Sequence, residues 1–130
     1  FLSTFFTSKT GSSTFFNGAI TTYSNASKNH FLNIPKNDID MYGVVSDQVV
    51  RKMAYNVRER FQADYGLATT GYVDSLSPID SLKKNRLGAW IAVASKNHVI
   101  SEYVVLKNTR LQNISTVSYK LLNLFVKEIR

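Results

Sequence analysis

The chain contains no cysteine and has only two histidines among its 130 residues. The absence of cysteine excludes disulfide bonds and thiolate chemistry, and His30 and His98 alone do not make a structural zinc site. Any covalent chemistry must therefore use oxygen or amine groups. We expect neither a metal nor another cofactor.

Long apolar runs are also missing. No stretch of about 18 apolar residues occurs, so the sequence predicts no membrane-spanning helix. The opening, Phe1-Leu2-Ser3-Thr4-Phe5-Phe6, lacks the charged flank and long apolar run of a signal peptide, and it begins in mid-pattern without a cap or turn. We therefore expect a soluble, cytoplasmic protein without membrane contact, whose natural start lies before Phe1.

Acidic residues are few, at nine against sixteen lysines and arginines, which gives a formal net charge of +7. Such a balance suits anionic partners such as nucleotides, nucleic acids or acidic membrane surfaces. The basic residues are scattered in blocks no longer than two, without the interleaved aromatic residues of single-strand binders. The charge therefore selects none of these partners, and ordinary solvated surface explains it as well.

With 44% hydrophobic residues, the chain is large enough for one domain, 1–130, and too short for two. Ser46 suits an N-cap, Asp47 suits the first turn, and apolar residues recurring every three or four positions predict a helix over 46–63. The other expected elements are the end of a helix at 1–7, a strand at 14–24, a short helix and loop within 27–42, a strand at 65–70, a long polar loop at 71–87, a hairpin at 88–95 and 98–106, and a closing helix at 110–129.

Helices interspersed with strands favour an α/β fold, a single layered domain with a mixed β-sheet flanked by helices. The polar stretch 71–87 is longer than typical connections in a compact domain, and such loops are usually functional or disordered.

Hydroxyls, a phenol and an amine gather between Gly11 and Lys28. A serine becomes a nucleophile only when a base takes its proton, and without a suitable histidine that base is a lysine with a lowered pKa, for which Lys28 is the candidate. Ser13 and Tyr23 stand at opposite ends of the predicted strand, which would span roughly 33 Å if straight, so they meet only if the chain bends or the strand is shorter. Alternatively, Ser12 and Ser13 are turn residues and Lys28 is a solvated charge.

Several motifs follow one another along the chain: Gly11-Ser12-Ser13 with an aromatic pair and Gly18, Thr22-Tyr23-Ser24-Asn25 followed by Lys28, Tyr42-Gly43-Val44-Val45-Ser46, Ala68-Thr69-Thr70-Gly71, Gly88-Ala89-Trp90-Ile91-Ala92 and Asn108-Thr109-Arg110. This series resembles the CinA C-terminal domain family, also called the nicotinamide mononucleotide amidohydrolase domain. The resemblance covers nearly the whole chain in the right order and implies that family's α/β fold.

A serine and lysine mechanism is what the resemblance implies. Ser13 would attack the carboxamide carbon of nicotinamide mononucleotide, Lys28 would act as general base and then acid, and Tyr23 would position or relay the proton. The products would be nicotinate mononucleotide and ammonia, in pyridine nucleotide salvage.

The resemblance also implies a binding site for this small nucleotide. Thr70 and Gly71 would line the pocket, and Arg110 would face the phosphate, for which its fork of donors is suited. Arg110 has an alternative explanation as a surface charge at the start of a helix. Homo-oligomerisation is left open.

Two departures separate the chain from the family. The family begins with a strand that leads into Glu-Ser-Cys-Thr-Gly-Gly, and this chain starts after that second glycine, so the domain lacks a core strand and part of the pocket. Either the segment precedes Phe1 or the chain pairs with another copy, and we expect the first. After Gly71 the family's Ile-Ala-Gly-Pro is replaced by Tyr72-Val73-Asp74-Ser75, in which Tyr72 could stack on an aromatic base or merely pack over the sheet.

Three functions therefore compete. The first is the amidohydrolase, the second is a catalytically silent nucleotide-binding or regulatory member of the same fold, and the third is a basic nucleic-acid-associated protein. Convergence of the three catalytic candidates would favour the first function, and wide separation would favour the second. A continuous basic face across Arg51, Arg58 and Lys84 would favour the third, which is the weakest because no basic stripe is visible.

Overall fold

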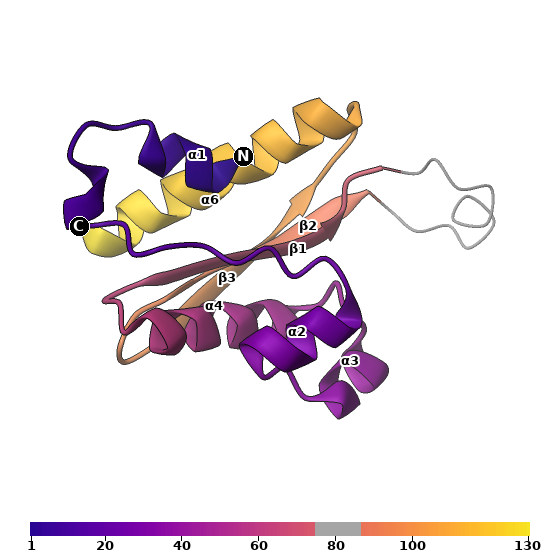
Figure 1. The fold of residues 1–130 in the computed structure, drawn as a ribbon. Coiled ribbons are helices and arrows are strands. Elements are labelled where there is room, and N and C mark those ends of the chain that lie inside the picture. Colours follow the sequence, from indigo (N-terminus) through magenta and orange to yellow (C-terminus); the bar gives the residue numbers. More distant parts are fainter. Residues whose placement is uncertain (75–86) are drawn as a thin grey trace.

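The structure, a computed structural model, describes residues 1–74 and 87–130. A β-sheet lies between two layers of helices, with α6 and α1 over one face and α4, α2 and α3 over the other (Figure 1). The elements are α1 (Leu2–Thr7), the short 3-10 helix η1 (Ser12–Thr14), α2 (Asn25–Leu32), α3 (Lys36–Tyr42), α4 (Asp47–Phe61), β1 (Gly66–Tyr72), β2 (Gly88–Ala94), β3 (Val99–Val105) and α6 (Arg110–Ile129). The expected layered α/β fold is confirmed.

The sheet has the order β1-β2-β3. The sequence had suggested a mixed sheet. Both pairings are antiparallel, so within the described residues the sheet is purely antiparallel. The expected hairpin is confirmed as β2 and β3, and β1 extends two residues beyond the expected Thr70. The predicted loop over 71–87 falls mostly on residues 75–86, which lie outside the described residues.

Helix α4 confirms the clearest local prediction. The Ser46 hydroxyl accepts the N–H of Val49 at 3.3 Å and so caps the first turn. One face buries Val49, Val50, Met53 and Ala54 against the sheet. Gly66 lets β1 approach α4 closely, because a Cβ there would clash with the carbonyl of Ala54.

Helix α6 covers the opposite face and also confirms its prediction. Thr109 and Gln112 form a capping box at its start. Val117, Leu121 and Leu124 pack against the apolar side chains that β2 directs to this face, so β2 is buried between the two helical layers. None of the described helices is long and apolar enough to cross a bilayer.

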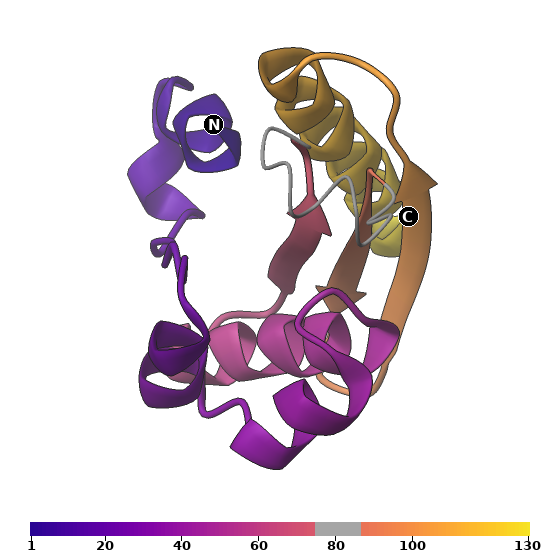
Figure 2. The same ribbon diagram turned by 90° about the vertical axis from the view of Figure 1, so that its right-hand side faces the viewer.

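The predicted strand at 14–24 is wrong. Residues 12–14 form η1, residues 15–23 have no regular structure, and α2 begins at Asn25 with Ser24 as its cap. The aromatic and β-branched residues there do favour extended backbone, but a strand also needs a partner for its N–H and C=O groups. β1, the nearest strand, pairs only with β2 in the described sheet, and segment 15–23 runs apart from it (Figure 2).

Candidate functional site

Lys28 is the most unusual side chain at the site. It lies on α2 with only 7% of its surface exposed, and Nζ donates a hydrogen bond of 2.7 Å to the carbonyl oxygen of Thr22. Among the described residues, no carboxylate forms an ion pair with it. Burial disfavours the charged form and lowers the pKa of Lys28 below its usual range. A larger fraction of this amine is therefore unprotonated at a given pH, and so able to accept a proton, than of a solvated lysine.

Tyr23 stands next to the group that holds this amine. It follows Thr22 in the chain, and its side chain is 84% exposed. The next residue, Ser24, forms a capping box with Ser27 that fixes the start of α2. The local sequence thus places an exposed phenol and a buried amine on one tight segment.

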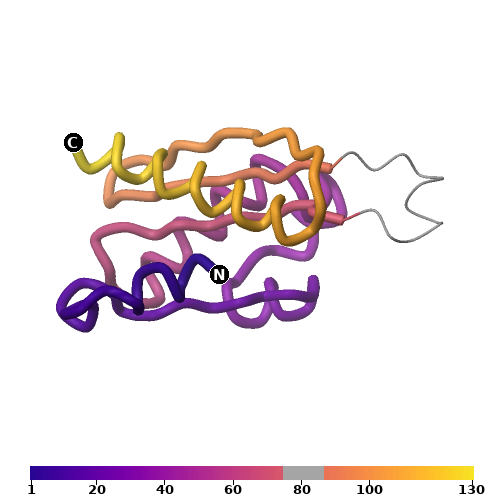
Figure 3. Tube along the Cα trace, turned by 90° about the horizontal axis from the view of Figure 1, so that it is seen from above, coloured from indigo at the N-terminus to yellow at the C-terminus, as the bar shows by residue number. Residues whose placement is uncertain are grey.

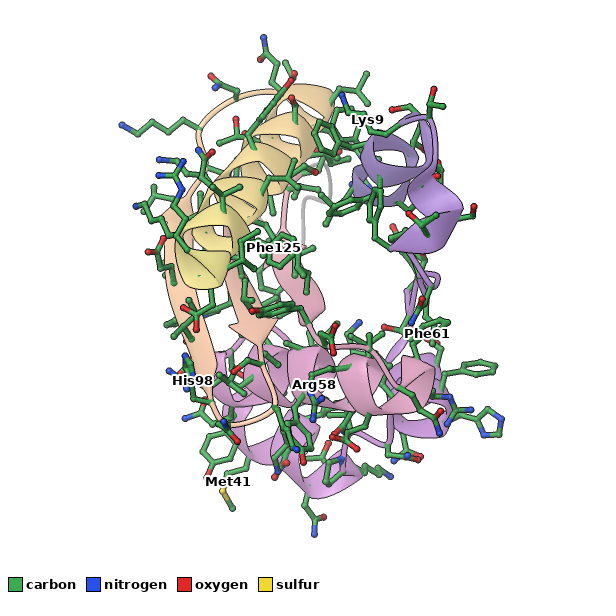
Figure 4. All side chains as sticks on the ribbon, turned by 90° about the vertical axis from the view of Figure 1, so that its left-hand side faces the viewer. Lys9, Met41, Arg58, Phe61, His98 and Phe125 are labelled. Carbon is green, nitrogen blue, oxygen red and sulfur yellow. The ribbon has the colours of Figure 1, made fainter. Side chains whose placement is uncertain are left out.

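Ser13 lies elsewhere. It is exposed on η1, and α2 begins at the opposite end of the molecule along the direction of the strands (Figures 1 and 3). Between them the chain crosses the end of α4, where the Asn17 amide donates to the carbonyl of Phe61 at 3.2 Å (Figure 4). If extended, residues 16–22 alone span roughly 20 Å. The structure therefore does not bring Ser13 and Lys28 of one chain together.

Thr70 and Gly71 lie near the C-terminal end of β1. Thr70 is buried, and its hydroxyl donates to the carbonyl of Val44 at 2.9 Å, which ties the strand to the turn before α4. A Cβ on Gly71 would lie 2.5 Å from the Cβ of Ala89 and 2.7 Å from the carbonyl oxygen of Gly88. The hydrogen bond of Thr70 and the close packing at Gly71 therefore explain these two residues without a ligand.

Arg110 begins α6 at this same end of the sheet. Its Nη1 lies 3.9 Å from Oδ2 of Asp74, and its side chain is half exposed, so the guanidinium is held loosely and stays accessible. The start of α2, the end of β1 and the start of α6 thus lie toward one end of the molecule, and η1 lies toward the other (Figure 3). The starts of α2 and α6 are on opposite faces of the sheet (Figure 1).

Asn113 is a positioning residue that the sequence pattern did not reveal. It is 1% exposed, and its amide donates to the carbonyls of Val73 and Asn108, each at 2.9 Å. Its side-chain oxygen accepts the N–H of Asn108 at 3.0 Å. These bonds fix the start of α6, and with it Arg110, to the end of β1. The sequence signal that could have identified Asn113 is an amide side chain on the otherwise apolar face of α6.

Two of the three basic residues whose continuous face would favour nucleic-acid binding lie among the described residues, and each of the two has an acidic partner. Arg51 pairs with Asp47 at 2.9 Å and donates to the carbonyl of Val99, and Arg58 pairs with Glu59. Lys84 lies outside the described residues. In the described part of the chain, no three metal-ligating side chains gather.

Comparison with known proteins gives a consistent family. The family model for the CinA C-terminal domain matches residues 1–129. A CinA-like protein of Amoebophilus asiaticus is 35% identical over 131 residues, which cover all of this chain and 31% of that protein. A CinA-like protein of Cytophaga hutchinsonii is 30% identical with the same coverage. This chain therefore spans about a third of these relatives. Protein MG115 of Mycoplasma genitalium is 33% identical over 92% of this chain and 74% of its own length.

Solved structures agree on the fold. A CinA superfamily protein from Escherichia coli has a TM-score of 0.87 at 19% identity, covering 96% of this chain and 72% of that one. The competence/damage inducible protein CihA from Agrobacterium tumefaciens has a TM-score of 0.88 at 21% identity, covering 99% and 78%. The shared fold and the family match over nearly every residue lead to one conclusion: this chain belongs to the CinA C-terminal domain family.

Proposed function

We propose that this chain is an amidohydrolase that removes the carboxamide nitrogen of nicotinamide mononucleotide, with Lys28 as the proton acceptor and donor. The observation that carries the proposal is the buried Lys28, whose lowered pKa suits a general base. Membership of the CinA family supports the substrate class. The accessible Arg110 at the same end of the sheet supports a phosphorylated ligand.

In this mechanism a serine hydroxyl attacks the carboxamide carbon while Lys28 takes its proton. Lys28 then returns the proton to the nitrogen as the C–N bond breaks, and ammonia leaves. Water attacks the remaining ester, which releases nicotinate mononucleotide and restores the serine. Tyr23, whose exposed phenol follows the backbone partner of Lys28 in the chain, would relay a proton.

The identity of the serine is constrained by distance. Ser13 does not reach Lys28 of its own chain, because η1 and the start of α2 lie at opposite ends of the molecule. If Ser13 is the nucleophile, it acts on Lys28 of a second copy. The same separation favours a second candidate function, a catalytically silent nucleotide-binding or regulatory member of the family.

Ammonia release from nicotinamide mononucleotide by the full-length protein separates the two functions. We expect Lys28→Met to lose at least about a hundredfold in kcat, the usual contribution of a general base. The matched control Lys120→Met changes an exposed lysine of α6 and should keep full activity. A folded wild-type protein that binds the nucleotide but releases no ammonia would establish the silent function instead.

A further inference from the structure

Asn17 is the one asparagine of the chain that a glycine follows. In an Asn-Gly pair the backbone nitrogen of the glycine can attack the side-chain carboxamide of the asparagine, and the missing Cβ leaves that approach open. The pair lies in residues 15–23, which form neither helix nor strand, and Asn17 is exposed. The reacting groups therefore meet water and belong to no regular hydrogen-bonded element.

The backbone amide of Gly18 is free to react. Among the described residues, its N–H has no hydrogen-bond partner. By contrast, the amides that follow Asn29, Asn56 and Asn123 lie within α-helices, where each N–H donates to the carbonyl four residues before it. The nitrogen of Gly18 breaks no hydrogen bond when it turns toward a side chain, so it is more available as a nucleophile than these helical amides.

Packing against the end of α4 requires both members of the pair. A Cβ at position 18 would lie 2.6 Å from Cε1 of Phe61, so the ring occupies the space that Gly18 leaves. The side-chain amide of Asn17 donates to the carbonyl oxygen of Phe61 at 3.2 Å. Phe61 is the last residue of α4, and the final carbonyls of a helix have no partner within it. The fold thus uses an asparagine donor and a glycine at this crossing.

The bond from Asn17 is one of few polar contacts that hold the chain between η1 and α2. Two side-chain hydrogen bonds connect residues 17–22 to other described residues. One joins Asn17 to α4, and the other joins the amine of Lys28 to the carbonyl of Thr22. Ile20 adds an apolar contact with the core beneath α4. Loss of the bond from Asn17 would therefore weaken the hold on the first half of this segment.

We propose that Asn17 deamidates spontaneously and that the product frees residues 17–22 from the end of α4. The nitrogen of Gly18 attacks Cγ of Asn17, a new C–N bond closes a succinimide ring, and the C–N bond of the carboxamide breaks. The proton of the Gly18 N–H leaves with the amide group as ammonia. Water then opens the ring at either carbonyl, which gives aspartate or isoaspartate at position 17. Water is the co-reactant, and no oxidation or reduction takes place.

The product cannot keep the contact with α4. A carboxylate has no proton to donate to the carbonyl of Phe61. Its charge also lies at the C-terminal end of a helix, where the aligned peptide dipoles disfavour an anion. Isoaspartate adds a methylene to the backbone as well, so the chain between η1 and α2 changes length. The deamidated chain should therefore hold residues 17–22 less firmly than the unmodified chain.

Peptide mass spectrometry tests the reaction on the full-length protein. The protein is incubated in mildly alkaline water labelled with heavy oxygen, for the time that converts an unstructured Asn-Gly peptide, and is then digested with trypsin in ordinary water. The peptide 10–28 contains both Asn17 and Asn25, so it carries its own control. We expect labelled oxygen at position 17 and methylation of this peptide by an isoaspartyl methyltransferase. Equal labelling at Asn25, or no label at position 17, would overturn the site.

Substitutions test the consequence for the segment. Asn17→Asp keeps the shape of asparagine without the donor, and chymotrypsin should cut this variant after Phe16 severalfold faster than the wild type. Asn97→Asp makes the same change at an exposed residue of the β2–β3 turn, whose side chain has no hydrogen-bond partner among the described residues, and should be cut at the wild-type rate.

Aged protein provides a second measurement. Wild-type protein that has been incubated should show the same faster cleavage as Asn17→Asp. Asn17→Gln keeps an amide but would have to close a larger ring, so it should resist deamidation and show no change on ageing. If Asn17→Asp and the aged wild type are both cut at the original rate, the deamidated chain does not release residues 17–22, and that part of the proposal is overturned.

The ammonia from Asn17 does not imitate enzyme turnover. It amounts to one molecule per chain, it appears without substrate, and it appears equally in Lys28→Met. Ammonia release from nicotinamide mononucleotide therefore remains a separate test, and each proposal can fail without the other.

Discussion

Lys28 links the chemistry of the site to the stability of the fold. Burial lowers its pKa from the ordinary value of 10.5. Between the lowered pKa and 10.5, the unfolded state therefore binds more protons at this amine than the native state. The free energy of unfolding consequently rises with pH across that window, and below the lowered pKa the whole cost of burying a charged amine applies.

The rise of the free energy of unfolding with pH leads to a prediction for Lys28→Met. The variant should be more stable than the wild type at about pH 7, and the difference should shrink as the pH rises toward about 10. Urea denaturation at both pH values measures it, with exposed Lys120→Met as the control, whose difference should not depend on pH. If the difference in unfolding free energy between Lys28→Met and the wild type is also constant with pH, burial does not shift the pKa of the amine.

Neither the burial of Lys28 nor its partner was predictable from sequence. A lysine among Ser, Asn and Ala in the stretch 24–29 has the composition of a solvated helix face. Its partner is the carbonyl of Thr22, which lies before the cap of α2. The family motif identified the residue, and its environment came only from the tertiary structure.

At the level of elements, local signals decided which predictions succeeded. Helix α4 was predictable because its cap at Ser46 and its apolar spacing are both encoded within one segment. The strand expected over 14–24 failed because pairing depends on a neighbour that the segment's own composition does not specify. The antiparallel pairing of β1 with β2 was hidden for the same reason, whereas the hairpin of β2 and β3 was predicted.

Asn113 connects two elements at the site, and its loss should be costly. Asn113→Ala leaves the carbonyls of Val73 and Asn108 without their buried donor. We expect a loss of about 2 kcal/mol in the free energy of unfolding, the usual penalty for an unsatisfied buried partner. Urea denaturation measures it, and Asn123→Ala, an exposed change on the same helix, should cost under about 0.5 kcal/mol.

A second readout separates positioning from stability alone. Because Asn113 fixes the start of α6, its alanine variant should also raise KM for the nucleotide through displacement of Arg110, with a smaller effect on kcat. A stability loss with unchanged KM would assign Asn113 to the fold and not to the site.

For the whole molecule, the separation of Ser13 from Lys28 makes a serine and lysine mechanism depend on assembly. Each chain exposes Ser13 at one end and carries Lys28 at the other, so a two-fold dimer could form two sites, each with Ser13 from one copy and Lys28 from its partner. In that arrangement, specific activity should fall on dilution as dimers dissociate.

Mixing two inactive variants tests this arrangement directly. Ser13→Ala and Lys28→Met should each be inactive alone, but equimolar mixing followed by subunit exchange should restore about a quarter of wild-type ammonia release, because half the dimers are mixed and each has one intact site. As a control for the serine-to-alanine change itself, Ser12→Ala is mixed with Lys28→Met in the same way. Full activity of Ser13→Ala alone would remove Ser13 from the mechanism. If both variants are inactive and exchanged dimers stay inactive, the two residues do not act across copies, and the silent function gains support from the geometry of the single chain.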